Sequence, residues 1–256
     1  MKPLLEVRDV SLSYHSISGE TNALSHISFD LLPGEFLAVV GPSGCGKSTL
    51  LNLICGLLAA EEGSILMEGK PIPKGTSRIG YMLQKDHLLE WRSVYKNVLL
   101  GLEIRKEVTK EKLAYIDQML EIYGLDKFRD SRPSQLSGGM RQRAALIRTL
   151  ALKPEFLLLD EPFSALDYQT RLDVSDDIAK IIRQSGVTTL LVTHDLSEAI
   201  SIADRIIVLG KRPGHIRKIV TIDFKTNKKL SSKEARIHPK FQEYFNQIWK
   251  ELKADE

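Results

Sequence analysis

The stretch that decides the fold is FLAVVGPSGCGKST, residues 36–49. Its first five residues form a continuous apolar run, the pattern of a strand buried on both faces of a sheet. The loop that follows, residues 41–49, fits G-x-x-x-x-G-K-[ST], and a helical pattern extends from Lys47 to Leu58. A buried strand, a glycine-rich loop and a helix in this order predict a phosphate-binding loop in an α/β protein.

The residue types in the loop suit a nucleotide triphosphate. Glycines allow backbone N–H groups to approach phosphate oxygens without a Cβ atom in the way, and the start of the helix adds a partial positive charge. We expect Lys47 to reach the β- and γ-phosphates and the Ser48 hydroxyl to bind Mg²⁺. The whole loop is predicted to hold the nucleotide, with Cys45 as a small filler that has no chemistry of its own: Gly41, Pro42, Ser43, Gly44, Cys45, Gly46, Lys47, Ser48 and Thr49.

A second motif, FLLLDEP at residues 156–162, places two carboxylates at the end of another apolar run. Ligands bind at the carboxyl ends of strands in open α/β sheets, so Asp160 and Glu161 are expected at such an edge. Asp160 is suited to holding a hydrated Mg²⁺ ion. Glu161 is suited to polarising the attacking water as a general base.

The remaining chain predicts further strands and helices around this core. Residues 4–14 alternate apolar and polar, as a half-buried strand does, and Pro33-Gly34-Glu35 indicates a tight turn. Apolar runs at 188–192 and 205–209, separated by helical stretches, indicate a largely parallel sheet. Residues 85–153 carry helical spacing and few strand signals, which indicates an inserted helical subdomain.

The C-terminal segment predicts an amphipathic helix after a capping box at Ser231 and Glu234. The apolar face of this helix is made by Phe241, Tyr244, Phe245, Ile248, Trp249 and Leu252. We favour packing of this face on the parent domain over docking of a partner protein. The predicted domains are therefore an ATPase domain over residues 1–225 and a helical extension over 226–256.

Composition excludes several classes of protein. The chain has 256 residues, a net charge of +3 and 43% hydrophobic residues, which is ordinary for a globular protein and leaves no basic excess for binding nucleic acid. Two cysteines are too few for a disulfide framework and fit a reducing cytosol. The most apolar stretch, residues 50–60, is shorter than the roughly 20 residues that span a membrane. We therefore expect a soluble protein whose membrane role, if any, requires a partner.

The motif LSGGMRQR at residues 136–143 resembles the signature motif of ABC ATPases. Gln84 after an apolar strand, the sequence SALD at 164–167, and His194 in LVTHD stand in the order of that family, and the resemblance extends over residues 4–220. It implies a P-loop NTPase core with a largely parallel sheet, an N-terminal antiparallel β subdomain and an inserted helical subdomain. It also implies that the chain binds ATP with Mg²⁺ and hydrolyses it.

The resemblance assigns roles to single side chains near the phosphate loop. It implies that Gln84 touches the metal or the attacking water and reports to a permease. It implies that His194 contacts the γ-phosphate and that the Tyr14 ring stacks on adenine. The alternatives are a core histidine for His194 and plain core packing for Tyr14.

The resemblance also implies a site shared between two copies of the chain. Ser137, Gly138 and Gly139 would cap the γ-phosphate of a nucleotide held by the opposite subunit, and Asp167 would bridge the subunits. A Ser-Gly-Gly sequence that opens a helix offers backbone donors to an anion, which agrees with this role. The alternative is a helix N-cap followed by a flexible turn.

Two segments resemble one branch of importers in the family, the branch that serves nitrate, sulfonates, taurine and some pyrimidine precursors. They are HLLEWRSVYKNVLLGLE at 87–103 and LGKRPGHI at 209–216, although that branch often has Pro where this chain has Glu90. The branch implies an ATP-hydrolysing dimer on the cytoplasmic face of the membrane, bound to an integral-membrane permease and indirectly served by a solute-binding protein. The solute would be a small anionic or heteroaromatic nutrient.

Three other functions were weighed against this one. A GTPase should carry N-K-x-D, and the nearest string, Asn227-Lys228-Lys229-Leu230, lacks the Asp. A soluble ABC protein of repair or translation typically has paired nucleotide domains or long inserts, which this sequence does not show. An ABC exporter shares the same motifs and stays an alternative.

Overall fold

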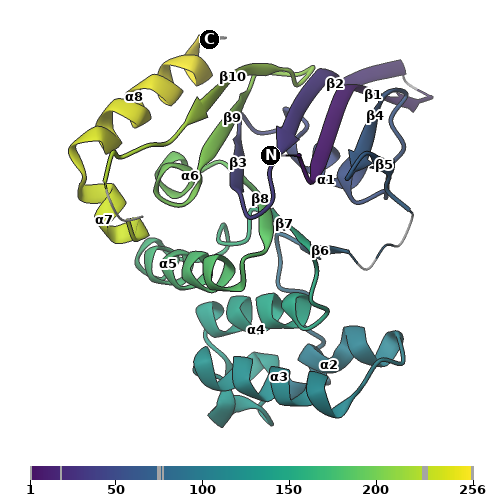
Figure 1. The fold of residues 1–256 in the computed structure, drawn as a ribbon, viewed down its shortest axis with the longest axis vertical. Helices are drawn as coiled ribbons and strands as arrows, with labels where there is room; N and C mark the ends of the chain where they lie inside the picture. Colours follow the sequence, from purple (N-terminus) through teal and green to yellow (C-terminus); the bar gives the residue numbers. More distant parts are fainter. Residues whose placement is uncertain (1, 18, 74–75, 77, 227–229, 255–256) are drawn as a thin grey trace. The chain divides into compact units, whose positions relative to one another are not determined.

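The chain forms two compact units, and the second is inserted into the sequence of the first. In the computed structural model, residues Met1–Thr76 and Ile182–Glu256 make the first unit and Ser77–Ile181 make the second (Figure 1). The structure describes all residues except 1, 18, 74–75, 77, 227–229 and 255–256, so the string Asn227-Lys228-Lys229 lies outside the described residues.

An antiparallel sheet forms the N-terminal part of the first unit. Its strand order is β2-β1-β4-β5. The sheet confirms the predicted N-terminal antiparallel β subdomain, and the inward residues of β1 alternate with partly exposed ones, as the sequence pattern indicated. The strands span β1 Leu5–Ser16, β2 Gly19–Leu31, β4 Glu62–Met67 and β5 Lys70–Pro71.

A largely parallel sheet carries the phosphate loop in the same unit. The strands β10, β9, β3 and β8 follow one another in this order, with β3 parallel to both β8 and β9 and β10 antiparallel at the edge. Every residue of β3 and β8 is buried, which confirms the prediction of strands covered on both faces. Their bounds are β3 Phe36–Val40, β8 Thr188–Thr193, β9 Arg205–Leu209 and β10 Ile216–Thr221.

The end of β3 aligns with the ends of its two neighbours. Val40 pairs with Thr193 of β8 and with Val208 of β9. The residues that follow these strands therefore leave the sheet at one edge. They are the phosphate loop, His194, and the segment 210–215.

The helices of the first unit are α1 Lys47–Ile54, α6 Leu196–Ile202, α7 Ser232–Ile237 and α8 Pro239–Lys253. Helix α1 is shorter than the predicted helix to Leu58, because Gly56 adopts a left-handed φ of 75° directly after the C-cap residue Cys55. The predicted capping box of Ser231 and Glu234 is present at the start of α7.

Helix α8 packs on its own unit, as we favoured from the sequence. It contacts α6, β9 and β10, and Ile248 on its inner face is completely buried. Trp249 lies at the margin of this face, stacked on Phe245 and 48% exposed. The domain boundary near residue 225 stays a prediction.

The second unit joins two parallel strands to a group of helices. Strands β6 Ile79–Met82 and β7 Phe156–Asp160 pair in parallel. Helices α2 and α3 both contact α4, which confirms helical structure in the inserted segment. The helices are α2 Val94–Ile104, α3 Lys110–Ile122, α4 Gly138–Leu150 and α5 Tyr168–Ser185, with short 3₁₀ turns at Asp126–Phe128 and Pro133–Gln135. Helix α5 runs across the boundary between the units.

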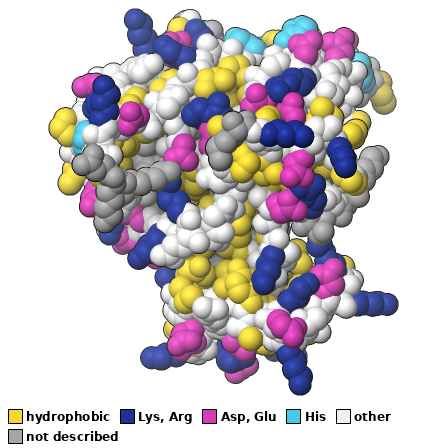
Figure 2. All heavy atoms as spheres, in the orientation of Figure 1, with side chains coloured by type: hydrophobic (Ala, Val, Ile, Leu, Met, Phe, Trp, Pro, Cys, Tyr) yellow, Lys and Arg dark blue, Asp and Glu magenta, His cyan; other side chains and the backbone are white. Residues whose placement is uncertain are grey.

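The surface in view in Figure 2 mixes both signs of charge, with Lys and Arg side chains interspersed among Asp and Glu. Among the described residues, no helix has both the length and the apolar character needed to cross a membrane.

Candidate nucleotide-binding and catalytic site

The lysine of the phosphate loop is hydrogen-bonded to the backbone at the start of the same loop. The Lys47 ammonium is buried to 6% exposure and donates to the carbonyl oxygens of Gly41 at 2.9 Å and Pro42 at 3.0 Å. An ammonium has three N–H donors, so one donor is left for a phosphate oxygen. Gly44 and Gly46 adopt left-handed φ values of 77° and 99°, which bend the backbone around the loop.

The thiol of Cys45 lies inside this loop and stays neutral. Burial raises the pKa of the Cys45 thiol, and the positive charges of Lys47 and Arg212 only partly oppose that effect. The side chain is 1% exposed. This environment suits the small, unreactive filler predicted from the sequence.

Tyr14 and His194 lie at the surface rather than in the core. The Tyr14 side chain is 44% exposed, and its hydroxyl lies 3.1 Å from the Thr49 hydroxyl of the phosphate loop. His194 is exposed directly after β8, the neighbour of the strand that feeds the loop. Core packing, the alternative weighed for both residues, is therefore wrong. Adenine stacking by Tyr14 and γ-phosphate contact by His194 stay predictions.

The second unit brings Gln84, Asp160 and Glu161 together. Because β6 and β7 are parallel with Met82 opposite Leu159, the residues after both strands leave at one edge. Gln84 Nε2 lies 3.4 Å from Glu161 Oε2. Asp160 is 8% exposed, and the Tyr81 hydroxyl donates to its Oδ2 at 3.4 Å. Contacts of this length are weak hydrogen bonds.

Glu161 stands in a backbone conformation that is rare for its residue type. Its φ is 43°, in the left-handed region, and its carbonyl oxygen accepts hydrogen bonds from the Ser164 N–H at 3.1 Å and the Ser164 hydroxyl at 2.9 Å. Strained residues of this kind persist where the surrounding turn fixes them, and they concentrate at functional sites. The turn positions the Glu161 carboxylate just beyond the end of β7.

The Ser-Gly-Gly sequence begins helix α4. The Ser137 hydroxyl accepts the Met140 N–H at 3.3 Å, so Ser137 is the N-cap of α4. An N-cap is the alternative to a phosphate contact that the sequence analysis gives for this residue. Ser137 and Gly138 are exposed, so the helix N-terminus is open to an anion. Both readings are compatible, since the cap uses the side chain and an anion would use backbone N–H groups.

Asp167 caps the next helix, α5. Its Oδ1 accepts the Thr170 N–H at 3.0 Å. Hydrogen bonds from Thr170 lower the pKa of the Asp167 carboxyl. The residue is exposed, which suits the predicted contact with a second subunit.

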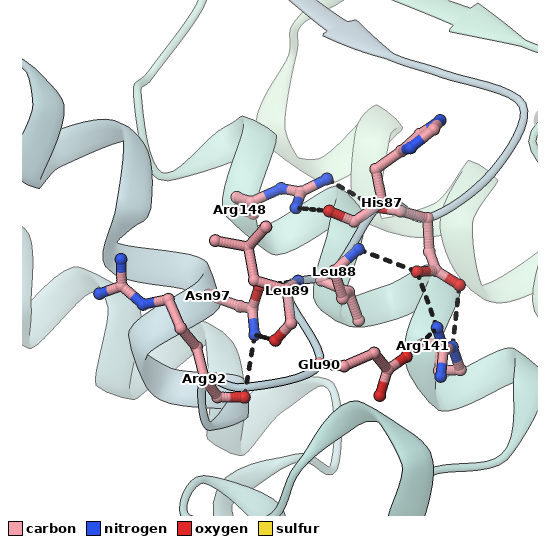
Figure 3. Close-up of polar contacts among 9 residues, drawn as sticks. His87, Leu88, Leu89, Glu90, Arg92, Asn97, Arg141 and Arg148 are labelled. Atoms are coloured by element: carbon pink, nitrogen blue, oxygen red, sulfur yellow. Dashed lines mark hydrogen bonds and ion pairs between the residues drawn. The ribbon is translucent and has the colours of Figure 1, made fainter.

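Sequence reasoning missed a clamp that holds the loop after Gln84 against α4 (Figure 3). Arg141 donates to both oxygens of Asp86, at 2.9 and 3.1 Å, and pairs with Glu90 at 2.9 Å. Arg148 donates to the backbone carbonyls of Asp86 at 2.6 Å and His87 at 2.7 Å. The loop and the helix that carries the Ser-Gly-Gly sequence are thereby tied together. Glu90, where the importer branch often has Pro, is a member of this clamp.

The charges of the clamp set the titration of Asp86. Burial, the largest single influence, acts to raise the pKa of its carboxyl. The hydrogen bonds from Arg141 and the Leu88 N–H, with the charges of Arg141 and Arg148, outweigh burial, so the pKa lies below its ordinary value. Asp86 is therefore ionised throughout the neutral range.

Asn97 fixes the same loop from the side of α2 (Figure 3). Its side chain is completely buried and accepts the Leu89 N–H at 2.7 Å, and its two amide N–H groups are shared among the carbonyls of Leu89, Arg92 and Ser93, which lie 3.1, 3.2 and 3.0 Å from Nδ2. The signal in the sequence was an amide on the apolar face of a helix, in VYKNVLLGL. A buried polar side chain of this kind requires partners, and the loop supplies them.

The predicted site residues thus fall into two groups, one in each unit. The first unit holds Tyr14, residues 41–49 and His194. The second unit holds Gln84, Asp160 and Glu161 at one strand edge, with Ser137-Gly138-Gly139 and Asp167 at helix starts. The first group is built for phosphate, and the second offers carboxylates and a further anion-binding helix start.

Comparisons with known proteins identify the family of the chain. A family model described as ABC transporter matches residues 24–164. An uncharacterised ABC transporter ATP-binding protein, YtlC of Bacillus subtilis, is 46% identical over 250 residues, which cover 98% of this chain and 96% of that protein. The taurine import ATP-binding protein TauB of Roseobacter denitrificans is 37% identical, with 96% and 94% covered.

A solved structure has the same fold. It is a dimeric post-hydrolysis state of the ATP-binding cassette MJ0796 bound to ADP and Pi, with a TM-score of 0.71 and 28% identity, covering 86% of this chain and 99% of that one. Motifs, fold and relatives agree. The chain therefore belongs to the family of ABC transporter ATP-binding proteins, which hydrolyse ATP, and to the branch of that family that includes taurine import ATP-binding proteins.

Proposed function

We propose that this ABC ATPase powers an importer by closing as a dimer on two Mg-ATP molecules. One observation carries the proposal: the chain presents a preformed phosphate loop, a carboxylate pair after β7, and a separate helix start at the exposed residues Ser137 and Gly138. The first two supply binding and hydrolysis. The third has a role if it caps a triphosphate held by another copy.

The chemistry of the donors suits Mg²⁺. Ser48, Gln84 and Asp160 would offer hydroxyl, amide and carboxylate oxygens, which are the ligands that Mg²⁺ prefers. The Asp160 side chain is nearly buried at the strand end, where a nearby cation would stabilise its negative charge. Magnesium would neutralise charge that develops on the phosphates, while Glu161 would take the proton from the attacking water.

The dimer follows from the exposed helix start. In a two-fold dimer each Ser137-Gly138-Gly139 turn would meet the nucleotide held by the partner's loop, and Asp167 would lie at the contact. The similar solved structure is dimeric and holds ADP and Pi, which supports this arrangement. ATP would act as the link between the copies, and hydrolysis would loosen them.

The chain would act at the cytoplasmic face of a membrane through a permease. The relatives named for import of taurine and of aliphatic sulfonates support import of a small anionic or heteroaromatic nutrient, such as a sulfonate, nitrate, taurine or a pyrimidine precursor. Trp91, in the loop clamped to α4, is 74% exposed and offers the permease an apolar contact. A solute-binding protein would deliver the solute to the permease.

The catalytic assignment is tested with Glu161→Gln. This change keeps the shape of the side chain and removes the base, so ATP binding should persist while turnover falls by about 100-fold or more. Glu155→Gln, at the opposite end of β7 and paired with Arg78, is the matched control and should keep turnover. A Glu161→Gln variant that hydrolyses ATP at a near-native rate would refute the assignment.

The import assignment is tested in cells. Deleting the gene should impair growth when a sulfonate is the sole sulfur source or nitrate the sole nitrogen source, and the intact gene should restore growth. Accumulation of a drug or lipid intermediate in the deletion strain would indicate export instead.

A further inference from the structure

The segment between β9 and β10, residues 210–215, contacts the phosphate loop, although none of its residues is among the predicted site residues. Its Arg212 Nε donates to the carbonyl oxygen of Gly44 at 3.1 Å. A Cβ built on Gly44 would lie 3.7 Å from Arg212 Nη2, so the guanidinium lies against the loop backbone itself. This arginine is exposed, so its contact with the loop is not a by-product of core packing.

Backbone contacts fix the position of this segment. Gly214 N–H donates to the Ala23 carbonyl at 2.9 Å, and its carbonyl accepts the Ser25 N–H at 2.9 Å. A Cβ on Gly214 would lie 2.0 Å from the carbonyl oxygen of Cys45, so only glycine permits this approach. The segment is therefore anchored to β2 and to the phosphate loop at once.

The segment is also closed upon itself. Gly210 N–H donates to the His215 carbonyl at 3.0 Å, and His215 Nδ1 lies 3.0 Å from the Pro213 carbonyl. Together with the pairing of β9 and β10, these bonds hold the backbone on both sides of Arg212. The Arg212 side chain therefore extends to the Gly44 carbonyl from a backbone that is held on both sides.

We propose that Arg212 is a positioning residue for nucleotide binding, which orders the phosphate loop through the Gly44 carbonyl. In a planar trans peptide the C=O of Gly44 and the N–H of Cys45 point in opposite directions, so a donor on one fixes the other. The Cys45 N–H indeed turns into the loop, to the Pro42 carbonyl at 3.3 Å. The guanidinium also adds a permanent positive charge beside the place where the triphosphate binds. This inference rests on the proposed nucleotide function of the loop.

Arg212→Gln is the informative variant, since it removes the positive charge and replaces the long guanidinium side chain with a shorter, neutral donor. The Kd for a fluorescent ATP analogue and the KM for ATP should rise by about three- to tenfold, with kcat within about twofold of wild type. The difference in affinity between wild type and Arg212→Gln should become smaller at high salt, because salt screens the positive charge of Arg212, which the Gln variant lacks. Arg212→Lys, which keeps a cationic donor, should recover most of the affinity.

Lys211→Gln is the matched control, because it removes the same charge from the adjacent exposed position. It should leave both constants within about twofold of wild type. An Arg212→Gln variant with wild-type Kd and KM would overturn the proposal, as would an equal loss in Lys211→Gln. A loss that Arg212→Lys does not recover would also overturn it, since a merely structural arginine would behave in that way.

This experiment distinguishes failure of the proposed function from failure of the proposed role of Arg212. If wild type binds the analogue without hydrolysing ATP, the proposed function fails, while Kd still reports on Arg212. If wild type hydrolyses ATP and Arg212→Gln matches it in Kd and KM, only the role of Arg212 fails. Melting curves of each variant are recorded without nucleotide. They establish an assay temperature at which every variant is folded.

Discussion

Replacing Asn97 by Ala should release the loop that follows Gln84. The change removes the amide that contacts four backbone groups, but the consequence differs from group to group. The carbonyl of Leu89 keeps the Arg92 N–H, and the carbonyl of Ser93 keeps the backbone N–H of residue 97. The Leu89 N–H and the Arg92 carbonyl lose the partner that the amide gave them. At about 1–3 kcal/mol for each buried group left unsatisfied, partly relieved by water, local opening should become easier by about 2–4 kcal/mol.

Hydrogen exchange under native conditions measures this opening directly. Because about 1.4 kcal/mol corresponds to tenfold, protection of the Leu89 amide should fall by roughly 30- to 1,000-fold in Asn97→Ala. Lys96→Ala, an exposed change on the same helix, should leave protection unchanged. Equal protection of Leu89 in both variants would refute the reasoning that the buried amide holds the loop.

Three further outcomes follow from the geometry. Lys47→Ala should raise the Kd for ATP by about 100-fold, measured by titration with a fluorescent analogue, because charge-assisted hydrogen bonds to phosphate are lost. Arg205→Ala should lower the free energy of unfolding by about 2–4 kcal/mol in urea titrations. Glu35 is 8% exposed and bound by both Nε and Nη2 of Arg205, so its carboxylate would keep the Leu32 N–H but lose its cationic donor. The lowered pKa of Asp86 means that its stabilising effect is complete above its ordinary pKa near 4 and is lost as the pH falls through the folded value. The stability difference between wild type and Asp86→Asn should therefore be largest above about pH 5 and shrink below about pH 4.

Motifs with a fixed local geometry were predictable from the sequence. Residues 36–40 form the expected strand because every one is apolar, and the Ser231–Glu234 capping box depends only on neighbours in the chain. The carboxylates after β7 followed from their place at a strand end. In each of these cases the residues that cause the structure are adjacent in sequence.

Contacts between distant segments were not predictable in this way. Asp86 and Arg141 meet through the packing of a loop on α4, and Arg212 reaches Gly44 from a segment far along the chain. Charged residues of this kind carry no periodic signal that names a partner. The end of α1 was also placed too late, because the left-handed turn at Gly56 outweighed the apolar residues that follow it.

Two copies of the chain should close on ATP through Ser137. The molar mass of Glu161→Gln, measured by size exclusion with light scattering, shows whether they do. With Mg²⁺ and ATP this variant should run as a dimer, and with ADP as a monomer. Adding Ser137→Arg should abolish the dimer, while adding Ser134→Arg, the same bulk on an exposed neighbouring position, should preserve it. A dimer that forms regardless of nucleotide and of Ser137→Arg would show that the copies do not close on ATP through Ser137.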